Sequence, residues 1–213
     1  GSEAMCGNGL RCFAKYLIQN QLINNLTFQV KTIAGIKDII CYSENGRINE
    51  IKVNMGKPIF EPDLIPIISK GNIPVIDEQI SILNKNIHGV ALSMGNPHFV
   101  TFVDEVDSFD LISIGALVEK HSIFPKRTNF EIVEVQNEHT IKMRVWERGA
   151  GITLSCGTGT CACAVASIIT NRIKSPVIVK VPGGILEVTY EKNGEVFLKG
   201  PAEIVFKGEI EFN

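Results

Sequence analysis

Apolar and polar positions follow two different periods along this chain, and each period predicts a different kind of element. Apolar residues recur at helical spacing in three segments, 10–19, 108–120 and 160–170, which predicts three helices. Shorter apolar runs bounded by Gly, Pro and Asn predict strands. The predicted strands fall within 26–58, 90–94, 99–103, 128–146, 177–181 and the C-terminal residues. Residues 59–86 predict an irregular connection with short strands.

The order of these predicted elements repeats once. A Cys-Gly turn leads into a helix at Cys6 and again at Cys156, and each helix is followed by a strand and a glycine at nearly the same distance. Each half continues with an Asn-Gly pair between strands, which is a strong hairpin signal. The repeat predicts two pseudo-symmetric halves with one such cysteine each.

The repeat also places the domain boundary. We expect an N-terminal half over 1–58 and a C-terminal half over 59–213, with a last strand near 202–212 crossing back to the first. In the second half, predicted strands precede the cysteine, whereas the chain begins only shortly before Cys6. We therefore expect the first domain to be incomplete.

Composition narrows the functional class. The chain has 213 residues, 45% of them hydrophobic and 21% charged, which is typical of a globular protein. A formal net charge of −2 gives no indication of a nucleic-acid-binding surface. No apolar run is long enough for a transmembrane helix, and the N-terminus does not resemble a signal peptide. We expect a cytoplasmic protein with no membrane partner.

Cysteine usage suggests acid/base chemistry. A chain of this length does not need cross-links, and its cysteine spacing lacks the close pairs of structural zinc sites, so we expect neither disulfides nor a metal. Cys6 and Cys156 each precede a Gly-x-Gly turn at a predicted helix N-terminus, where the helix dipole lowers a thiol pKa and free N–H groups bind anions. We predict two acid/base thiols that face one anionic substrate. The other cysteines are assigned to core packing: Cys12, Cys41, Cys161 and Cys163.

Three further polar motifs allow a structural or a functional interpretation. Asn96 and His98 follow a predicted strand, where they form either a simple turn or part of a ligand site. Glu147 and Arg148 lie just upstream of the second cysteine, as either a solvated ion pair or a clamp for an ammonium and a carboxylate. Asn129 is a weaker polar candidate.

Taken together, these motifs resemble the diaminopimelate epimerase family over essentially the whole chain. The matching segments are Cys-Gly-Asn-Gly-x-Arg-Cys-Phe-Ala (6–14), Met-Gly-Asn-Pro-His (94–98), Arg-x-Asn (127–129), Trp-Glu-Arg-Gly (146–149) and Cys-Gly-Thr-Gly-x-Cys (156–161). The resemblance implies an α/β (α+β) fold of two pseudo-symmetric domains, each a curved mixed β-sheet around a central helix, with the site in the cleft between them.

The resemblance also implies a role for each matched residue. Cys6 and Cys156 would be the two bases that invert one α-carbon, interconverting LL- and meso-2,6-diaminopimelate without pyridoxal phosphate or any other cofactor. His98 would support catalysis near the reacting carbon. The substrate-binding residues would be Gly7, Asn8, Asn96, Asn129, Glu147, Arg148, Gly157 and Thr158. The implied partner is this small molecule, in lysine and peptidoglycan-precursor synthesis, with no nucleic acid; a homodimer is left open.

Two alternatives remain open at this point. Proline racemase-like enzymes share the fold and the two-cysteine arrangement. They resemble Cys-Gly-His-Gly at the first site and lack Trp-Glu-Arg-Gly before the second, so Asn8 and Arg148 argue against them. A non-catalytic ligand-binding or thiol-redox protein could be built on the same thiols. Exchange of the substrate α-proton with deuterated solvent separates an enzyme from a binding protein.

Members of the resembled family are longer at the N-terminus, and their lead-in to the first cysteine is one residue longer than 2–5 here. Their additional segment carries further substrate contacts. We therefore expect the first helix to expose an apolar face formed by Phe13, Ala14 and Leu17. We also expect these 213 residues alone to bind substrate weakly and not to turn it over.

Overall fold

The computed structural model describes residues 6–69 and 73–211, which form a mixed α+β structure. The described part contains helices α1 (Gly7–Gln19), α2 (Leu111–Glu119) and α3 (Gly157–Ile169). Its strands are β1 (Thr27–Thr32), β2 (Gly35–Glu44), β3 (Arg47–Gly56), β4 (Val75–Ile82), β5 (Lys85–Ser93), β6 (Pro97–Phe102), β7 (Asn129–Asn137), β8 (Thr140–Glu147), β9 (Gly151–Thr153), β10 (Val177–Val181), β11 (Gly184–Tyr190) and β12 (Val196–Gly200). Among the described residues, no helix combines the length and apolarity needed to cross a membrane.

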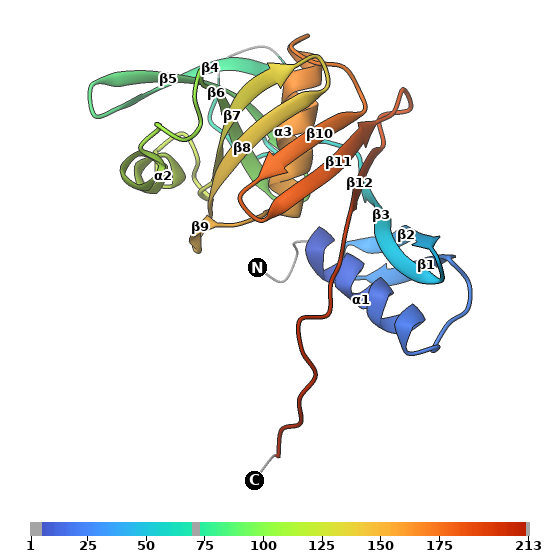
Figure 1. Cartoon of the computed structure of the whole chain (residues 1–213). Helices are drawn as coiled ribbons and strands as arrows, with labels where there is room; N and C mark the ends of the chain where they lie inside the picture. Colours follow the sequence, from blue (N-terminus) through green and yellow to red (C-terminus); the bar gives the residue numbers. More distant parts are fainter. Residues whose placement is uncertain (1–5, 70–72, 212–213) are drawn as a thin grey trace.

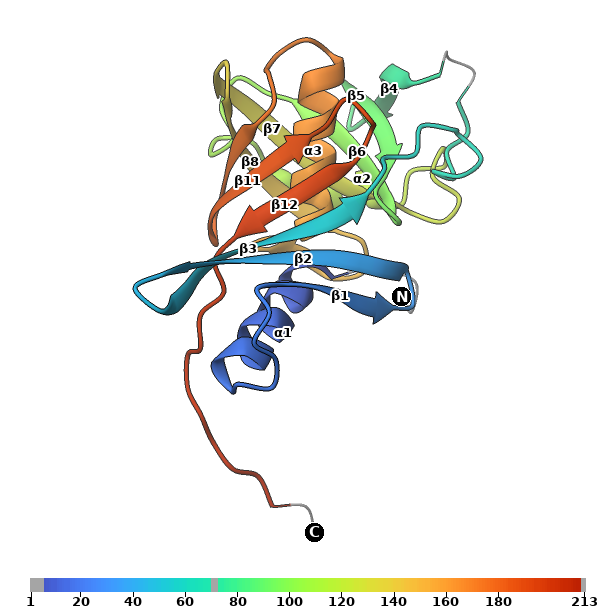
Figure 2. The same ribbon diagram turned by 90° about the vertical axis from the view of Figure 1, so that its right-hand side faces the viewer.

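All of these strands belong to one continuous sheet (Figures 1 and 2). The order is β1-β2-β3-β12-β11-β10-β8-β7-β6-β5-β4, and β9 pairs with β8. The sheet is mixed, because β6 pairs with β7 and β8 with β10 in parallel, whereas the other neighbours are antiparallel. This mixed sheet with few helices confirms the predicted fold class.

The predicted repeat is visible in the strand order. Helix α1 is followed by the antiparallel strands β1, β2 and β3, and helix α3 by β10, β11 and β12. Strand β3 pairs antiparallel with β12, so the two three-stranded units meet in mirror order along the sheet. The hairpin between β2 and β3 turns at Asn45 and Gly46, both with positive φ (50° and 75°), as a type I′ turn requires.

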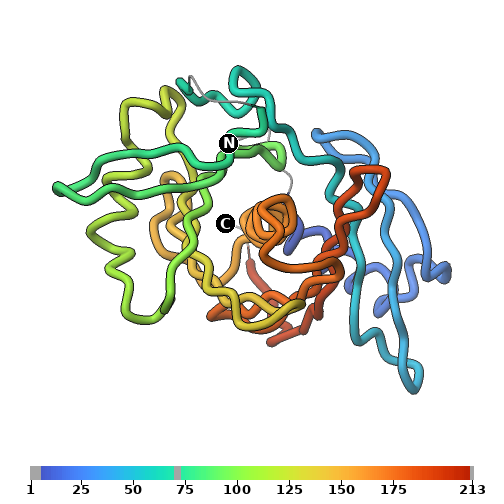
Figure 3. Tube along the Cα trace, turned by 90° about the horizontal axis from the view of Figure 1, so that it is seen from above, coloured from blue at the N-terminus to red at the C-terminus, as the bar shows by residue number. Residues whose placement is uncertain are grey.

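The two repeated helices differ in how far the sheet encloses them. Seen from above, α3 lies inside a ring of strands (Figure 3), and the residues from Gly157 to Ser167 are all buried. Helix α1 packs against β2 and β3, and its buried residues are Gly7, Leu10, Arg11 and Ala14. A second apolar core lies between α2 and the strands around β7, with Phe99 and Phe130 at its centre.

The expected apolar face of α1 is only partly as predicted. Ala14 is fully buried, because it packs in the core with Ile39 and Val53 of β2 and β3. Phe13 is 44% exposed and Tyr16 is 55% exposed, on the side that the sheet does not cover. The assignment of Cys12 to the core is wrong, because this side chain is exposed on the same open side.

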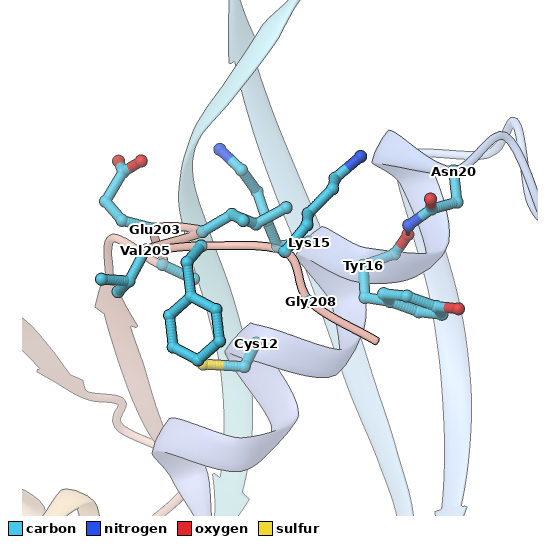
Figure 4. A pocket seen from close by; sticks show the side chains of 11 residues that line it. Cys12, Lys15, Tyr16, Asn20, Glu203, Val205 and Gly208 are labelled. Carbon is cyan, nitrogen blue, oxygen red and sulfur yellow. Dashed lines mark hydrogen bonds between the residues drawn. The ribbon is translucent and has the colours of Figure 1, made fainter. Parts of the chain in front are cut away.

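The expected last strand near 202–212 is not formed over its described residues, 202–211. The segment leaves the sheet after β12 and extends away from the molecule (Figure 1). Figure 4 shows that residues 202–208 run beside α1, with which they line a groove of about 610 Å³. Residues 202–208 lie beside α1 rather than beside a strand edge, so no β-ladder forms there.

Candidate active site

Cys6 and Cys156 occupy the same structural position in the two halves. Each is the N-cap of its helix with extended backbone (φ −100°, ψ 99° and φ −121°, ψ 115°). The backbone N–H of Gly9 donates to Cys6 Sγ over 3.2 Å, and the N–H of Gly159 donates to Cys156 Sγ over 3.4 Å. Each thiol therefore sits beside the unpaired N–H groups of a helix N-terminus, as predicted.

The two helix N-termini meet at their first residues. A Cβ added to Gly157 would lie 3.4 Å from Gly7 Cα and 3.5 Å from Asn8 Oδ1. The same added Cβ would lie 3.3 Å from Leu198 Cδ2, and one added to Gly7 would lie 3.1 Å from that atom. Glycine after each cysteine therefore permits a close approach of the two halves around Leu198. This contact brings two anion-binding helix ends to one place.

The two thiols differ in burial, and this corrects one prediction. Cys6 is exposed, whereas Cys156 is 6% exposed. The pKa of Cys156 is raised to about 12, mainly by burial and in addition by the charges of Glu147 and Glu131. The hydrogen bonds from Thr158 and the Gly159 N–H lower it by less. The prediction that the helix N-terminus lowers both thiol pKa values is therefore wrong for Cys156, because desolvation is the larger effect.

Residues of the first helix reach across to the second half. Asn8 Nδ2 donates to the backbone oxygen of Ser155 over 3.4 Å, directly before the second cysteine. Arg11 orients Asn8 by donating from Nη2 to its Oδ1 over 3.1 Å. Arg11 also donates from Nε to the oxygen of Pro201 over 3.3 Å, and its Nη1 is buried without a partner. Arg11 is thus a buried cation between α1 and the segment that follows β12. Its position on α1 alone does not predict this role.

His98 and Asn96 belong to a buried polar cluster behind Cys156. His98 is fully buried; its Nδ1 lies 2.7 Å from Glu131 Oε1, and its Nε2 lies 3.0 Å from Asn96 Oδ1. A Cβ added to Gly159 would lie 2.7 Å from Glu131 Oε1, so Glu131 packs directly against the Gly-Thr-Gly turn. Burial raises the pKa of Glu131, although the neighbouring His98 opposes this shift.

Glu131 was missed by the sequence analysis. Its second carboxylate oxygen, Oε2, is buried and has no hydrogen-bond partner. The available signal was an acidic residue inside an apolar strand, between Phe130 and Ile132 and two residues after Asn129. A charge at such a position is rarely buried unless it is paired or has a function.

Glu147 and Arg148 lie where β8 ends and turns toward β9. Thr153 Oγ1 donates to Glu147 Oε1, and Glu147 is close enough to Cys156 to raise its pKa. Arg148 donates from Nη1 to the backbone oxygen of Lys126 over 3.0 Å. The two residues are therefore not a solvated pair with each other.

Asn129 is a buried connector between loops. Its Nδ2 donates to the oxygen of Pro97 over 2.7 Å, and its Oδ1 accepts from the backbone N–H of Arg148 over 2.9 Å. Asn129 thereby joins the turn that carries Asn96 to the loop that carries Arg148. A direct contact with substrate stays a prediction for this residue.

Two thiols at the N-termini of two related helices that touch are the arrangement that the sequence analysis expects of a two-base racemase or epimerase. Solved structures share the fold. A hydroxyproline epimerase from Agrobacterium vitis has a TM-score of 0.71 at 14% identity, over 93% of this chain and 64% of that one. A PhzF-family phenazine biosynthesis protein from Bacillus anthracis has a TM-score of 0.62 at 17% identity, over 92% of this chain and 73% of that one. At these identities the likeness shows the fold alone.

Sequence comparison identifies the family within this class. Residues 1–61 and 90–205 match the family model of diaminopimelate epimerase. Diaminopimelate epimerases of Agathobacter rectalis and Methanococcus maripaludis are 45% and 44% identical, each over 99% of this chain and over 77% and 76% of their own lengths. That of Bacillus cereus is 41% identical over the whole chain and 75% of its own length. The chain belongs to the diaminopimelate epimerase family, a family of isomerases.

Proposed function

We propose that this chain carries the two bases that interconvert LL- and meso-2,6-diaminopimelate. The assay below also tests the expectation from the sequence that these 213 residues alone do not turn the substrate over. The observation that carries the proposal is the pair of Cys6 and Cys156, which cap two symmetric helices whose N-termini touch. Stereoinversion needs one base on each face of the reacting carbon, and two related halves supply that geometry. The family membership names the substrate, and six free cysteines suit a reducing compartment such as the cytoplasm.

One thiol removes the α-proton and the other donates a proton to the opposite face of the carbon. In one direction, the thiolate of Cys6 takes the α-proton, which forms an S–H bond and leaves the electron pair of the broken C–H bond on the carbon. The buried thiol of Cys156 then donates its proton to the opposite face and becomes the thiolate. The raised pKa of Cys156 supports its role as the donor in this direction. In the reverse direction the two roles exchange.

The developing negative charge needs stabilisation at the α-carboxylate. The N-termini of α1 and α3 present free N–H groups and the positive ends of two dipoles, with Asn8 and Thr158 beside them. We assign the distal amino-acid group to Asn96, Glu147 and Arg148. Arg148 would pair with the distal carboxylate and Glu147 with an ammonium group. The cluster of His98 and Glu131 supports Cys156 from behind.

Single substitutions of the two thiols test the proposal. Cys6→Ala and Cys156→Ala should each lower kcat by about a thousandfold, within the range expected for losing a general acid or base. The assay follows incorporation of solvent deuterium at the α-carbon of diaminopimelate, with proline as a second substrate. Cys41→Ala, at a buried cysteine outside the site, is the control. Turnover within tenfold of wild type in either thiol variant, or turnover of proline instead, would contradict the proposal.

A further inference from the structure

A buried carboxylate outside the assigned site holds the loop that carries Glu147 and Arg148. Glu119 is the last residue of α2 and is 4% exposed. Trp146 Nε1 donates to its Oε2 over 2.7 Å, and the backbone N–H of Gly149 donates to its Oε1 over 3.1 Å. These two donors flank Glu147 and Arg148 on either side, so one carboxylate fixes both ends of the pair.

The same carboxylate reaches the neighbouring loop. Arg127 Nη1 donates to Glu119 Oε1 over 3.4 Å, and the backbone N–H of Thr128 donates to the Glu119 carbonyl over 3.3 Å. Residues 126–129 in turn contact Arg148, through the Lys126 carbonyl and the Asn129 side chain. Glu119 therefore ties together the two segments that position the Arg148 guanidinium.

Helix α2 is packed tightly against this loop. A Cβ added to Gly115 would lie 2.7 Å from Trp146 Cβ and 2.8 Å from Trp146 Cγ, so the helix backbone lies directly on the indole. Gly115 lies one helical turn before Glu119, which places the close approach and the carboxylate on the same side of α2. A buried carboxylate is stable only when its oxygens are satisfied, and here the loop supplies those donors.

We propose that Glu119 is the positioning residue of the substrate-recognition loop 146–149. Its carboxylate accepts hydrogen bonds from both ends of this loop, and it thereby sets where Arg148 meets the distal carboxylate of an amino-acid substrate. The inference rests on the proposed function for the identity of that substrate. It adds a specificity-determining residue on α2, which contributes none of the residues assigned to the site.

Glu119→Gln tests the inference with nearly unchanged shape. The amide puts N–H groups where one carboxylate oxygen stood, so Trp146 or Gly149 loses its acceptor. The chain has one tryptophan, so the indole N–H gives a single resonance in a ¹H–¹⁵N spectrum. We expect this resonance to move, and KM for diaminopimelate to rise about tenfold or more with a smaller change in kcat. Glu119→Asp, which keeps the carboxylate, should recover part of the loss.

Glu138→Gln is the matched control, because Glu138 is exposed and forms a surface ion pair with Lys174, away from Trp146 and Arg148. It should leave both the resonance and KM unchanged. A moved resonance with unchanged KM in Glu119→Gln would reduce Glu119 to a structural role and overturn the inference. An unmoved resonance would show that the Trp146 contact is not made.

Direct binding separates this inference from the proposed function. Titration of Trp146 fluorescence with diaminopimelate measures Kd by a readout that does not depend on α-proton exchange. If the wild type binds but shows no α-proton exchange, the proposed function fails alone, and a weaker Kd in Glu119→Gln still supports the positioning role. Equal Kd values for the two proteins would overturn it, and no binding by the wild type would overturn both proposals.

Discussion

At the scale of single residues, Cys6 and Cys156 show that the same local geometry does not give the same chemistry. Both thiols accept a hydrogen bond from the N–H three residues on, at the N-terminus of a helix. Cys156 is nevertheless enclosed beside two acidic side chains, Glu131 and Glu147. Burial and like charge both favour the protonated thiol, and together they outweigh the helix N-terminus. The surroundings of Cys156, which come from β7 and β8, therefore favour its protonated thiol.

This difference predicts how alkylation of Cys156 depends on pH. With a pKa of about 12, Cys156 has little thiolate at pH 8, and its rate of modification by iodoacetamide should still rise beyond pH 10. Glu147→Gln removes a neighbouring negative charge, so the pKa should fall and Cys156 should react faster at any given pH. Peptide mapping by mass spectrometry distinguishes Cys156 from the exposed Cys6. Glu138→Gln is the control, and equal rates in the two variants would show that the Glu147 charge does not reach the thiol.

Arg148 offers a second test at this scale. Arg148→Lys keeps the charge but loses the planar fork that pairs with a carboxylate through two hydrogen bonds. We expect kcat/KM for diaminopimelate to fall about 30-fold or more, which corresponds to ~2 kcal/mol. Arg172→Lys is the matched control, since Arg172 lies over the Phe102 ring after the C-terminal end of α3. Unchanged kinetics in Arg148→Lys would reassign Arg148 to its contact with the Lys126 carbonyl.

At the scale of elements, the sequence pattern predicts the repeated units well and the connections poorly. The helical spacing and Cys-Gly turns locate α1 and α3, and Asn45-Gly46 locates the β2–β3 hairpin, because these signals are local. The eight-residue strand β4 lies in a region expected to be an irregular connection with short strands, and the pattern does not predict its bounds. Its hairpin turns at Leu83 and Asn84, both with positive φ, and Leu at such a position gives no turn signal.

One close contact between strands gives a test of stability. A Cβ added to Gly89 of β5 would lie 2.5–2.8 Å from three ring atoms of Phe99, which is fully buried and packs against Phe124 and Phe130. Gly89→Ala should lower the free energy of unfolding by about 1–3 kcal/mol, because the ring cannot move without disturbing the core. Urea denaturation measures the change.

Two further variants show whether the ring is the cause. Gly208→Ala should be nearly neutral, since its added Cβ would lie no closer than 3.8 Å to its neighbour Phe206. Phe99→Leu removes the crowding atoms, so Gly89→Ala should cost less in that background, as a double-mutant cycle would record. An additive cycle would contradict the assigned contact.

At the scale of the whole molecule, the candidate site depends on contacts between segments that are far apart in the sequence. The two cysteines and their glycines can be identified from the sequence, because each forms a local turn-and-helix motif. Glu131, Arg11 and Glu119 cannot, since their importance arises from burial against other elements: Glu131 beneath the turn at Gly159, Arg11 beside Pro201, and Glu119 beside Trp146. The mirror order around β3 and β12 explains why the helix ends touch.

The unequal enclosure of α1 and α3 leads to a last prediction, on local stability. Ala14 and Ala164 hold equivalent positions in the two repeated helices, and both side chains are fully buried. Helix α3 is surrounded by strands, whereas α1 is covered on one side and exposes Phe13. The amide of Ala14 should therefore exchange with solvent through local opening at a lower free energy than the amide of Ala164, which should exchange only on global unfolding. Native-state hydrogen exchange in this chain at low urea concentrations measures both amides at once. Equal protection would mean that the sheet holds both helices in one cooperative unit, and that the open side of α1 costs it no stability.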